Sequence, residues 1–371
     1  MNLSTSKSYT KINKRFDWLD GVRGCAILFV VIFHSVEVLP KDSLLRYFFS
    51  FGQYGVQLFF VVSALTCVLT LKKNKIIDWY IRRFIRIALI YYIGIIIYYP
   101  IFKLEAIIGV KSDEFSNLKN IVANIFFIHG WVPSANNNVV PGGWSIAVEM
   151  NFYLIAPFIV LLGSKTKYGV IILNIFLILS LLLFNYIYNF PVVNNSFEYF
   201  WPINQLPVFF IVIALYYCSK NFWDEIDLSF LKIGLGLIFI FLAVFIGVYK
   251  NINNILAPTL VGCGFYIFIL GLGYHRRLFE IKPLIFLGRI SFSLYIVHFA
   301  FEHFFRFIVH ILEKNYQISI LVYLLVIVLI ILFSVITAQF MYNKIEVKYT
   351  VLSEKIIDLK NTFLERNIGK N

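Results

Sequence analysis

Long apolar blocks separated by short polar breaks run through most of the chain, and this pattern restricts its fold more than any other feature. Blocks of roughly 16 to 27 residues have the length that an α-helix needs to cross a bilayer. Only 14% of the residues are charged and the mean hydropathy is +0.80. Backbone groups in lipid must be hydrogen-bonded within the chain, so we predict an all-α, polytopic membrane helical bundle of about ten transmembrane helices. The predicted segments are 24–39, 54–71, 79–100, 144–163, 168–189, 204–219, 230–249, 255–274, 284–309 and 318–343.

The Lys and Arg residues gather in alternate breaks between the apolar blocks. With ten crossings both termini face one side, and most of the 33 Lys and Arg residues fall on that side. The positive-inside rule identifies it as the cytoplasm, so both termini are predicted to be cytoplasmic. The net charge of +13 is then a topology signal, and no nucleic-acid partner is expected. The polar N-terminus has no apolar core, so we expect no cleavable signal peptide and predict a multi-pass protein of the cell inner (plasma) membrane.

Two segments outside the crossings are predicted to be helical. `NIVANIFFIHGW` is apolar but short, which favours a re-entrant or interfacial helix near 118–130. `KYTVLSEKIIDLKNTFLER` is typical of a basic, amphipathic surface helix. Since no linker-like stretch divides the chain, we predict a membrane-embedded domain at 1–350 and a basic cytoplasmic tail at 351–371.

The first apolar segment carries an arginine at one end and a histidine further in. Arg23 and His34 are eleven residues apart, so an α-helix places them on one face and roughly 16 Å apart along its axis. Arg23 is then expected at the cytoplasmic headgroup level and His34 in the outer half. An ionisable residue at that depth usually faces a bundle interior or a wet cavity. A structural histidine and a snorkelling arginine are the alternatives.

The segment `GGWSIAVEMNFYLIAP` places a carboxylate at a similar depth from the opposite side. Glu149 lies about a turn and a half inward from Trp144, where the crossing begins. A carboxylate in the outer leaflet needs a partner, and His34 is a natural one. Such a pair suits general-base work on a hydroxyl, although a purely structural pair remains an alternative. Glu37, three residues beyond His34, is the rival carboxylate.

Three further arginines stand where a crossing meets the cytoplasm. Arg82, Arg83 and Arg86 occur in `DWYIRRFIRIALIYY`, and guanidinium groups match phosphate oxygens. Positive-inside anchoring, or contact with anionic lipid headgroups, is the alternative. The four cysteines, Cys25, Cys67, Cys218 and Cys263, stand singly, so neither a disulfide framework nor a metal site is expected.

Five motifs in order resemble the acyltransferase-3 family of integral membrane acyltransferases. `LDGVRGCAILFVVIFHS`, `GVQLFFVVSA`, `RRFIRI`, `WSIAVEMNFY` and `LGRISFSLYIVH` are similar to blocks of that family and extend over nearly the whole chain. Gln57 stands where an acidic residue is common, Ala64 replaces a usual glycine, and Lys348 stands where a proline often follows the glutamate. The Arg, His and Glu positions of the motifs are present.

The resemblance implies O-acetyl transfer from cytoplasmic acetyl-CoA to a sugar hydroxyl of a surface or lipid-linked polysaccharide. It implies that Arg23, Arg82, Arg83 and Arg86 bind the donor, an acyl-CoA. No metal is expected to take part. His34 would be the general base, oriented by Glu149. The residues expected to contact the carbohydrate acceptor are Trp144, Tyr153, Tyr295 and His298.

A polysaccharide exporter or flippase without covalent chemistry is the alternative function. It would use the same cavity and aromatic rim but would not depend on CoA. Whether an acyl-enzyme forms, and whether a separate extracytoplasmic partner completes the transfer, stay open.

Overall fold

The structure is a computed structural model, and it describes residues 16–107, 117–188, 192, 195–219, 229–249 and 254–368. Each of the ten predicted segments corresponds to a helix, and the described residues contain no strand. The chain is a multi-pass membrane protein with an all-α fold. Within the described ranges, eight helices are long and apolar enough to span a membrane, and two shorter apolar helices accompany them. The basic stretch at 1–15 and Lys220, which entered the topology prediction, lie outside the described residues.

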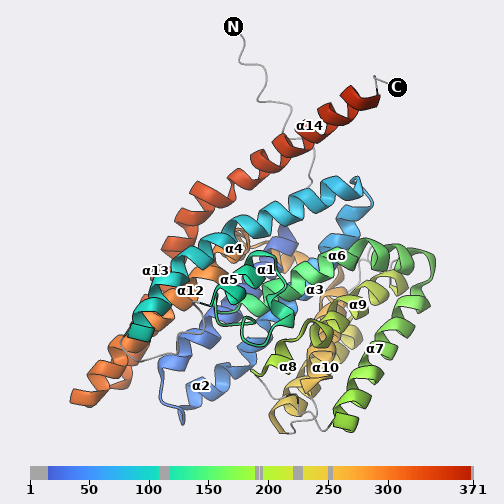
Figure 1. Cartoon of the computed structure of the whole chain (residues 1–371). Helices are drawn as coiled ribbons and strands as arrows, with labels where there is room; N and C mark the ends of the chain where they lie inside the picture. Colours follow the sequence, from blue (N-terminus) through green and yellow to red (C-terminus); the bar gives the residue numbers. More distant parts are fainter. Residues whose placement is uncertain are drawn as a thin grey trace.

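The long helices form a bundle that is broad in Figure 1, with α7 at one side and α13 at the other. Their bounds are α1 (Asp17–Ser35), α3 (Gly55–Leu71), α4 (Ile76–Ile107), α6 (Gly143–Lys165), α7 (Lys167–Tyr188), α9 (Pro202–Cys218), α10 (Phe230–Tyr249), α11 (Ala257–Gly271), α12 (Lys282–Asn315) and α13 (Ile320–Met341). We call the end predicted to face the cytoplasm the inner end, and the opposite end the outer end.

Helices α1 and α12 pack closely, because glycines on both remove the side chains that would separate them. A Cβ atom on Gly288 would lie 1.7 Å from the backbone oxygen of Asp20, and one on Gly24 would lie 2.1 Å from that of Leu284. Small residues allow such close backbone approach between membrane helices. The contact holds α1 beside the part of α12 that carries Tyr295 and His298.

Short elements close the outer end of the bundle. They are the 3₁₀ turns η2 (Val36–Val38) and η3 (Phe49–Tyr54), the short helices α2 (Leu44–Phe48), α5 (Leu118–Ile125) and α8 (Phe197–Phe200), and the turn η5 (His129–Trp131). The short helix predicted near 118–130 is therefore present as α5 and η5. Its polar side chains are buried, since Asn124 is 1% exposed and donates to the carbonyls of Asn120 and Ala135.

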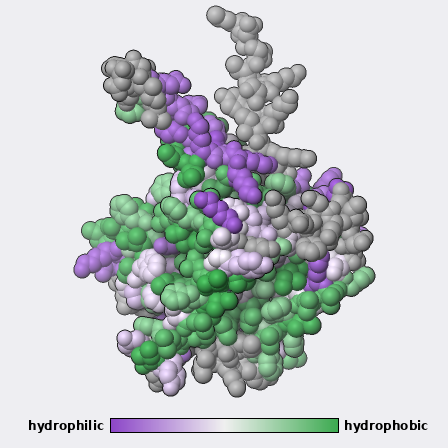
Figure 2. All heavy atoms as spheres, turned by 90° about the vertical axis from the view of Figure 1, so that its right-hand side faces the viewer, coloured by the Kyte–Doolittle hydropathy of each residue, from purple (hydrophilic) through white to green (hydrophobic). Residues whose placement is uncertain are grey.

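At the inner end, a π-helical turn η9 (Tyr342–Glu346) follows α13, a 3₁₀ turn η8 (Gly273–Glu280) precedes α12, and a final helix α14 (Lys348–Ile368) begins after η9. Figure 1 shows α14 alongside α4 at that end, and ion pairs join the two helices. In Figure 2 the visible body of the protein is largely apolar, and hydrophilic side chains gather at the top, where α14 lies. The apolar body is the part expected to lie in lipid.

Candidate functional site

Two adjoining cavities lie inside the bundle between α1, α3, α6 and α12. The empty space is about 690 Å³ in the inner cavity and about 540 Å³ in the outer one, and in both cavities part of this space is open to solvent. The inner cavity is lined by Arg23, Val56, Phe59, Phe60, Ser63, Arg83, Arg86, Ile87, Ser145, Ile146, Glu149, Tyr153, Ser291, Phe292 and Tyr295. The outer cavity is lined by Val30, Phe33, His34, Gln53, Val56, Asn137, Gly142, Trp144, Asn195, Tyr199, Phe200, Tyr295 and Phe299.

Arginine guanidinium groups from two helices converge on the inner cavity. Arg23 on α1 pairs with Asp20 at 2.9 Å and donates to the hydroxyl of Thr66 on α3. Arg83 on α4 donates to the hydroxyl of Tyr153 at 3.3 Å. Arg86 makes no hydrogen bond or ion pair with any residue that the structure describes. Three cations and one lining carboxylate give this cavity a positive balance that suits an anion.

Glu149 faces these arginines from α6. Its Oε1 accepts hydrogen bonds from the Ser63 hydroxyl at 2.7 Å and from the Tyr153 hydroxyl. The Ser63 and Tyr153 oxygens are themselves 2.9 Å apart. The three side chains form a closed polar cluster in the wall of the inner cavity, so Tyr153, predicted to contact the acceptor, lies with the arginines of the inner cavity instead.

His34 lies at the other end of α1 and lines the outer cavity. Its ring packs against Phe299, with centroids 4.5 Å apart, and lies 5.5 Å from the ring of His298. Trp144 lines the same cavity and stacks on Phe200 at 4.5 Å. The polar residues that line this cavity include Asn137, which belongs to the loop between η5 and α6.

The predicted pair of His34 with Glu149 does not form. Helix α1 begins at Asp17, seven residues earlier than predicted, so Arg23 is already about 9 Å into the bundle and His34 is one residue from the helix end. Glu149 lines the same cavity as Arg23, and its carboxylate accepts hydrogen bonds from Ser63 and Tyr153. The carboxylate beside His34 is the rival, Glu37, whose Oε1 is 3.7 Å from His34 Nδ1.

Tyr295 and Val56 line both cavities and so form the wall between them. The Tyr295 hydroxyl lies 2.8 Å from Ser145 Oγ and donates to the carbonyl of Gly142 at 3.0 Å. Gly142 has a φ of 73°, and a Cβ there would lie 2.8 Å from the Tyr295 hydroxyl and from a ring carbon of Phe299. A glycine is therefore required at the point where the loop meets the wall.

His298 is buried against the same region but lines neither cavity. Its side chain is 1% exposed, Nδ1 bonds the carbonyl of Leu294, and Nε2 has no partner among the described residues. Since a carbonyl only accepts, Nδ1 carries the proton. Because His298 does not line the outer cavity, its predicted contact with the acceptor has no geometric support.

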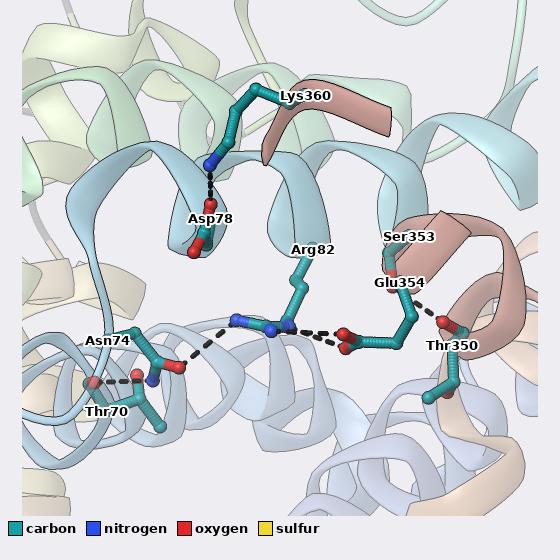
Figure 3. Close-up of polar contacts among 8 residues, drawn as sticks. All are labelled: Thr70, Asn74, Asp78, Arg82, Thr350, Ser353, Glu354 and Lys360. Carbon is teal, nitrogen blue, oxygen red and sulfur yellow. Dashed lines mark hydrogen bonds and ion pairs between the residues drawn. The ribbon is translucent and has the colours of Figure 1, made fainter. Parts of the chain in front are cut away.

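Arg82 is separated from the other two arginines of its cluster. It turns toward α14, where its guanidinium pairs with Glu354 at 2.9 Å and donates to Asn74 Oδ1 at 3.1 Å (Figure 3). Arg82 and Arg83 differ by 100° around the helix axis, so adjacent residues of one helix face different surroundings. Arg82 is not part of the inner cavity, and its predicted contact with the donor has no geometric support.

His129 was not predicted, yet it holds the loop that supplies Gly142 to the outer cavity. It is fully buried and stacks on Tyr91 with ring centroids 5.5 Å apart. Its Nε2 lies 2.9 Å from the carbonyl of Gly143, to which it must donate. Burial lowers the pKa of His129 to about 4, and the hydrogen bond to Gly143 only partly offsets this effect. The imidazole is therefore neutral near pH 7.

The described residues contain no group of three or more His, Cys, Asp or Glu side chains that could hold a metal ion. Ser63 and Ser145 line the inner cavity without having been singled out in the sequence. Both lie within motifs that carry the family resemblance, and these motifs were the sequence feature that could have identified them.

The comparisons with known proteins agree with the motifs. A family model described as an acyltransferase domain matches residues 16–339. A protein of Staphylococcus aureus strain MRSA252 named "Putative O-acetyltransferase" is 27% identical over 412 residues, which cover 99% of this chain and 63% of that protein. O-acetyltransferase OatA of Staphylococcus aureus strain NCTC 8325 is 26% identical over 386 residues, covering 92% of this chain and 60% of that protein. The chain thus spans about three fifths of the length of these relatives. No solved structure matches it significantly.

Proposed function

Because the chain belongs to the family defined by this acyltransferase domain, we propose that it is a membrane-bound O-acetyltransferase. In this proposal the donor is cytoplasmic acetyl-CoA and the acceptor is a sugar hydroxyl of a surface or lipid-linked polysaccharide. The membrane is the cell inner (plasma) membrane. The observation that carries the proposal is the pair of adjoining cavities, one with three arginines and one with His34, which share Val56 and Tyr295 in their linings.

The inner cavity suits the donor. CoA carries a diphosphate and a further phosphate, and guanidinium groups bind phosphate oxygens in charge-assisted, bidentate contacts. Arg23, Arg83 and Arg86 would bind those phosphates or line the path of the pantetheine arm. Glu149, together with Ser63 and Tyr153, would fix the wall of the donor cavity.

The outer cavity suits the acceptor. Trp144 and Phe200 offer an aromatic surface for a sugar ring, and Asn137 offers a polar side chain. His34 would accept the proton of the sugar hydroxyl as its oxygen attacks the thioester carbonyl. The carbon–sulfur bond then breaks, the acetyl ester forms, and CoA leaves as a thiolate that takes up a proton. For direct transfer, the thioester must reach the wall formed by Val56 and Tyr295.

The experiment supplies [¹⁴C]acetyl-CoA to inside-out membrane vesicles from cells expressing the chain. We expect label in the glycan fraction that mild alkali releases, as it releases O-esters. His34→Ala should reduce this label to a small residual rate while the amount of protein in the membrane is unchanged. His310→Ala is the matched control, since His310 is an exposed histidine of α12 that lines neither cavity.

An exporter or flippase would give a different result. Glycan would cross the membrane without incorporating acetyl groups, and His34→Ala would matter less than removal of Trp144. If vesicles that contain both the intact protein and the glycan acceptor yield only unlabelled glycan, the proposed function is contradicted.

A further inference from the structure

An ion network adjoins His34 on the side away from the inner cavity. Glu37 Oε1 is 3.7 Å from His34 Nδ1, and Glu37 Oε2 accepts a hydrogen bond from Arg306 Nη2 at 2.7 Å. Arg306 also pairs with Glu302, which lies one turn earlier on α12 and has a side chain only 4% exposed. The network therefore joins the outer end of α1 to α12.

The position of Glu37 is set by backbone contacts as well as by Arg306. Glu37 lies in η2, the 3₁₀ turn that continues α1 directly. Arg46 on α2 donates to the backbone carbonyls of Glu37 and Leu39, at 3.2 Å each. Because Glu37 is bonded through both its backbone and its carboxylate, it presents a fixed acceptor to the imidazole.

The groups around His34 carry charges of both signs. Two carboxylates, Glu37 and Glu302, contact the guanidinium of Arg306, and the Glu37 carboxylate is the one that faces the imidazole. The other ionisable groups nearby are His303, with Nε2 at 3.9 Å from Glu302, His298, whose ring is 5.5 Å from that of His34, and Arg46. Because the Glu37 carboxylate lies next to the imidazole, it favours the imidazolium that forms when a hydroxyl is deprotonated.

The orientation of the ring agrees with this role. Since Nδ1 faces Glu37, a proton on Nδ1 can point to the carboxylate, which leaves the Nε2 lone pair as the base. His34 lines the outer cavity, where the acceptor hydroxyl is expected. We propose that Glu37, held by Arg306, is the positioning residue that orients His34 as general base and stabilises its protonated form. This inference rests on the proposed acyl transfer, and it assigns to Glu37 the role that the sequence suggested for Glu149.

The first experiment measures acetyl transfer in the vesicle assay at varied [¹⁴C]acetyl-CoA. We expect Glu37→Gln to lower the rate at saturating donor about 100-fold without changing the KM for acetyl-CoA, because the donor cavity is untouched. Glu37→Asp should restore part of the rate. Glu313→Gln is the matched control, as this carboxylate of α12 also accepts a hydrogen bond, from Tyr323, but lines neither cavity.

Two further readouts separate positioning from structural support. In a His34→Ala background, Glu37→Gln should cause no further loss, because Glu37 acts through His34. ¹⁵N NMR of histidine-labelled protein should show the Nδ1–H tautomer for His34, assigned by difference from His34→Ala. Glu37→Ala should return it to the Nε2–H tautomer that a free imidazole prefers.

The inference is overturned if Glu37→Gln keeps the full rate, if its effect adds to that of His34→Ala, or if the tautomer does not depend on Glu37. If the unaltered protein transfers no acetyl group, the proposed function fails. The tautomer measurement, which needs no turnover, then decides by itself whether Glu37 orients His34.

Discussion

At the scale of single residues, the direction of each arginine on α4 decides what it can bind. Arg83 and Arg86 line the inner cavity, whereas the neighbouring Arg82 is engaged by Glu354 and Asn74 (Figure 3). Arg86 has no hydrogen-bonding partner among the described residues, so a phosphate would not have to displace one. What these three identical side chains can bind thus depends on both their rotation about the helix axis and their position along it.

We expect Arg83→Ala and Arg86→Ala each to raise the KM for acetyl-CoA at least tenfold. A hydrogen bond to a charged group contributes about 1.5 to 3 kcal/mol, which corresponds to roughly a tenfold to a hundredfold change. Initial rates in the vesicle assay at varied acetyl-CoA measure this. Arg82→Ala should leave the KM unchanged. An equal rise in KM for Arg82→Ala would mean that the inner cavity is not the donor site.

The separation of Arg82 from Arg83 also shows what the sequence could not provide. Charge and spacing predicted that this helix end is basic and cytoplasmic. They do not show which neighbouring helix or cavity each of the adjacent arginines faces. The pair of His34 and Glu149 failed for a related reason, since apolar composition marks the lipid-embedded part of α1 and not its start at Asp17. The helices themselves were predictable because a length of about 20 apolar residues leaves few other folds.

At the scale of elements, the close contact of α1 and α12 aligns the two ends of the site. Gly24 and Gly288 let the backbones approach, and this approach sets the height of Tyr295 and His298 relative to His34. A wider separation of these helices would open the wall between the cavities and move Arg306 away from Glu37.

We expect Gly288→Ala to lower the thermal stability of the purified protein, because its new Cβ would lie 1.7 Å from the Asp20 oxygen. Overpacking of this kind typically costs about 1 to 3 kcal/mol. Thermal unfolding in detergent, followed by tryptophan fluorescence, measures the change. Gly234→Ala on α10 is the control: nothing lies within 4 Å of its Cβ, and alanine favours a helix by up to about 1 kcal/mol. Equal melting temperatures for the two variants would contradict the close packing.

At the scale of the whole molecule, α14 is attached to the membrane bundle through ion pairs as well as through the buried side chain of Ile357. Asp78 on α4 pairs with Lys360, and Arg82 pairs with Glu354, so two ion pairs fasten the helix along α4 (Figure 3). Several apolar residues of α14, including Leu359 and Phe363, are exposed. The tail boundary near residue 350 stays a prediction, and the matched family domain ends at residue 339.

We expect Lys360→Asp to release α14, because it places two carboxylates together at Asp78. Hydrogen exchange of the α14 amides should then become faster. Combining Lys360→Asp with Asp78→Lys restores opposite charges and should restore slow exchange. Lys355→Asp, at an exposed position of the same helix, is the matched control. Fast exchange in the doubly substituted protein would show that charge pairing does not hold the helix.

The thin wall formed by Val56 and Tyr295 has a consequence for the cell that carries this protein. A continuous water-filled passage between the cavities would let protons and small ions cross and dissipate the membrane potential. In the proposed transfer, only an uncharged two-carbon group would be handed over at the wall, while the bulky, charged nucleotide would stay on its own side. Such a transfer would modify material outside the cell with an intracellular metabolite without opening a passage for ions.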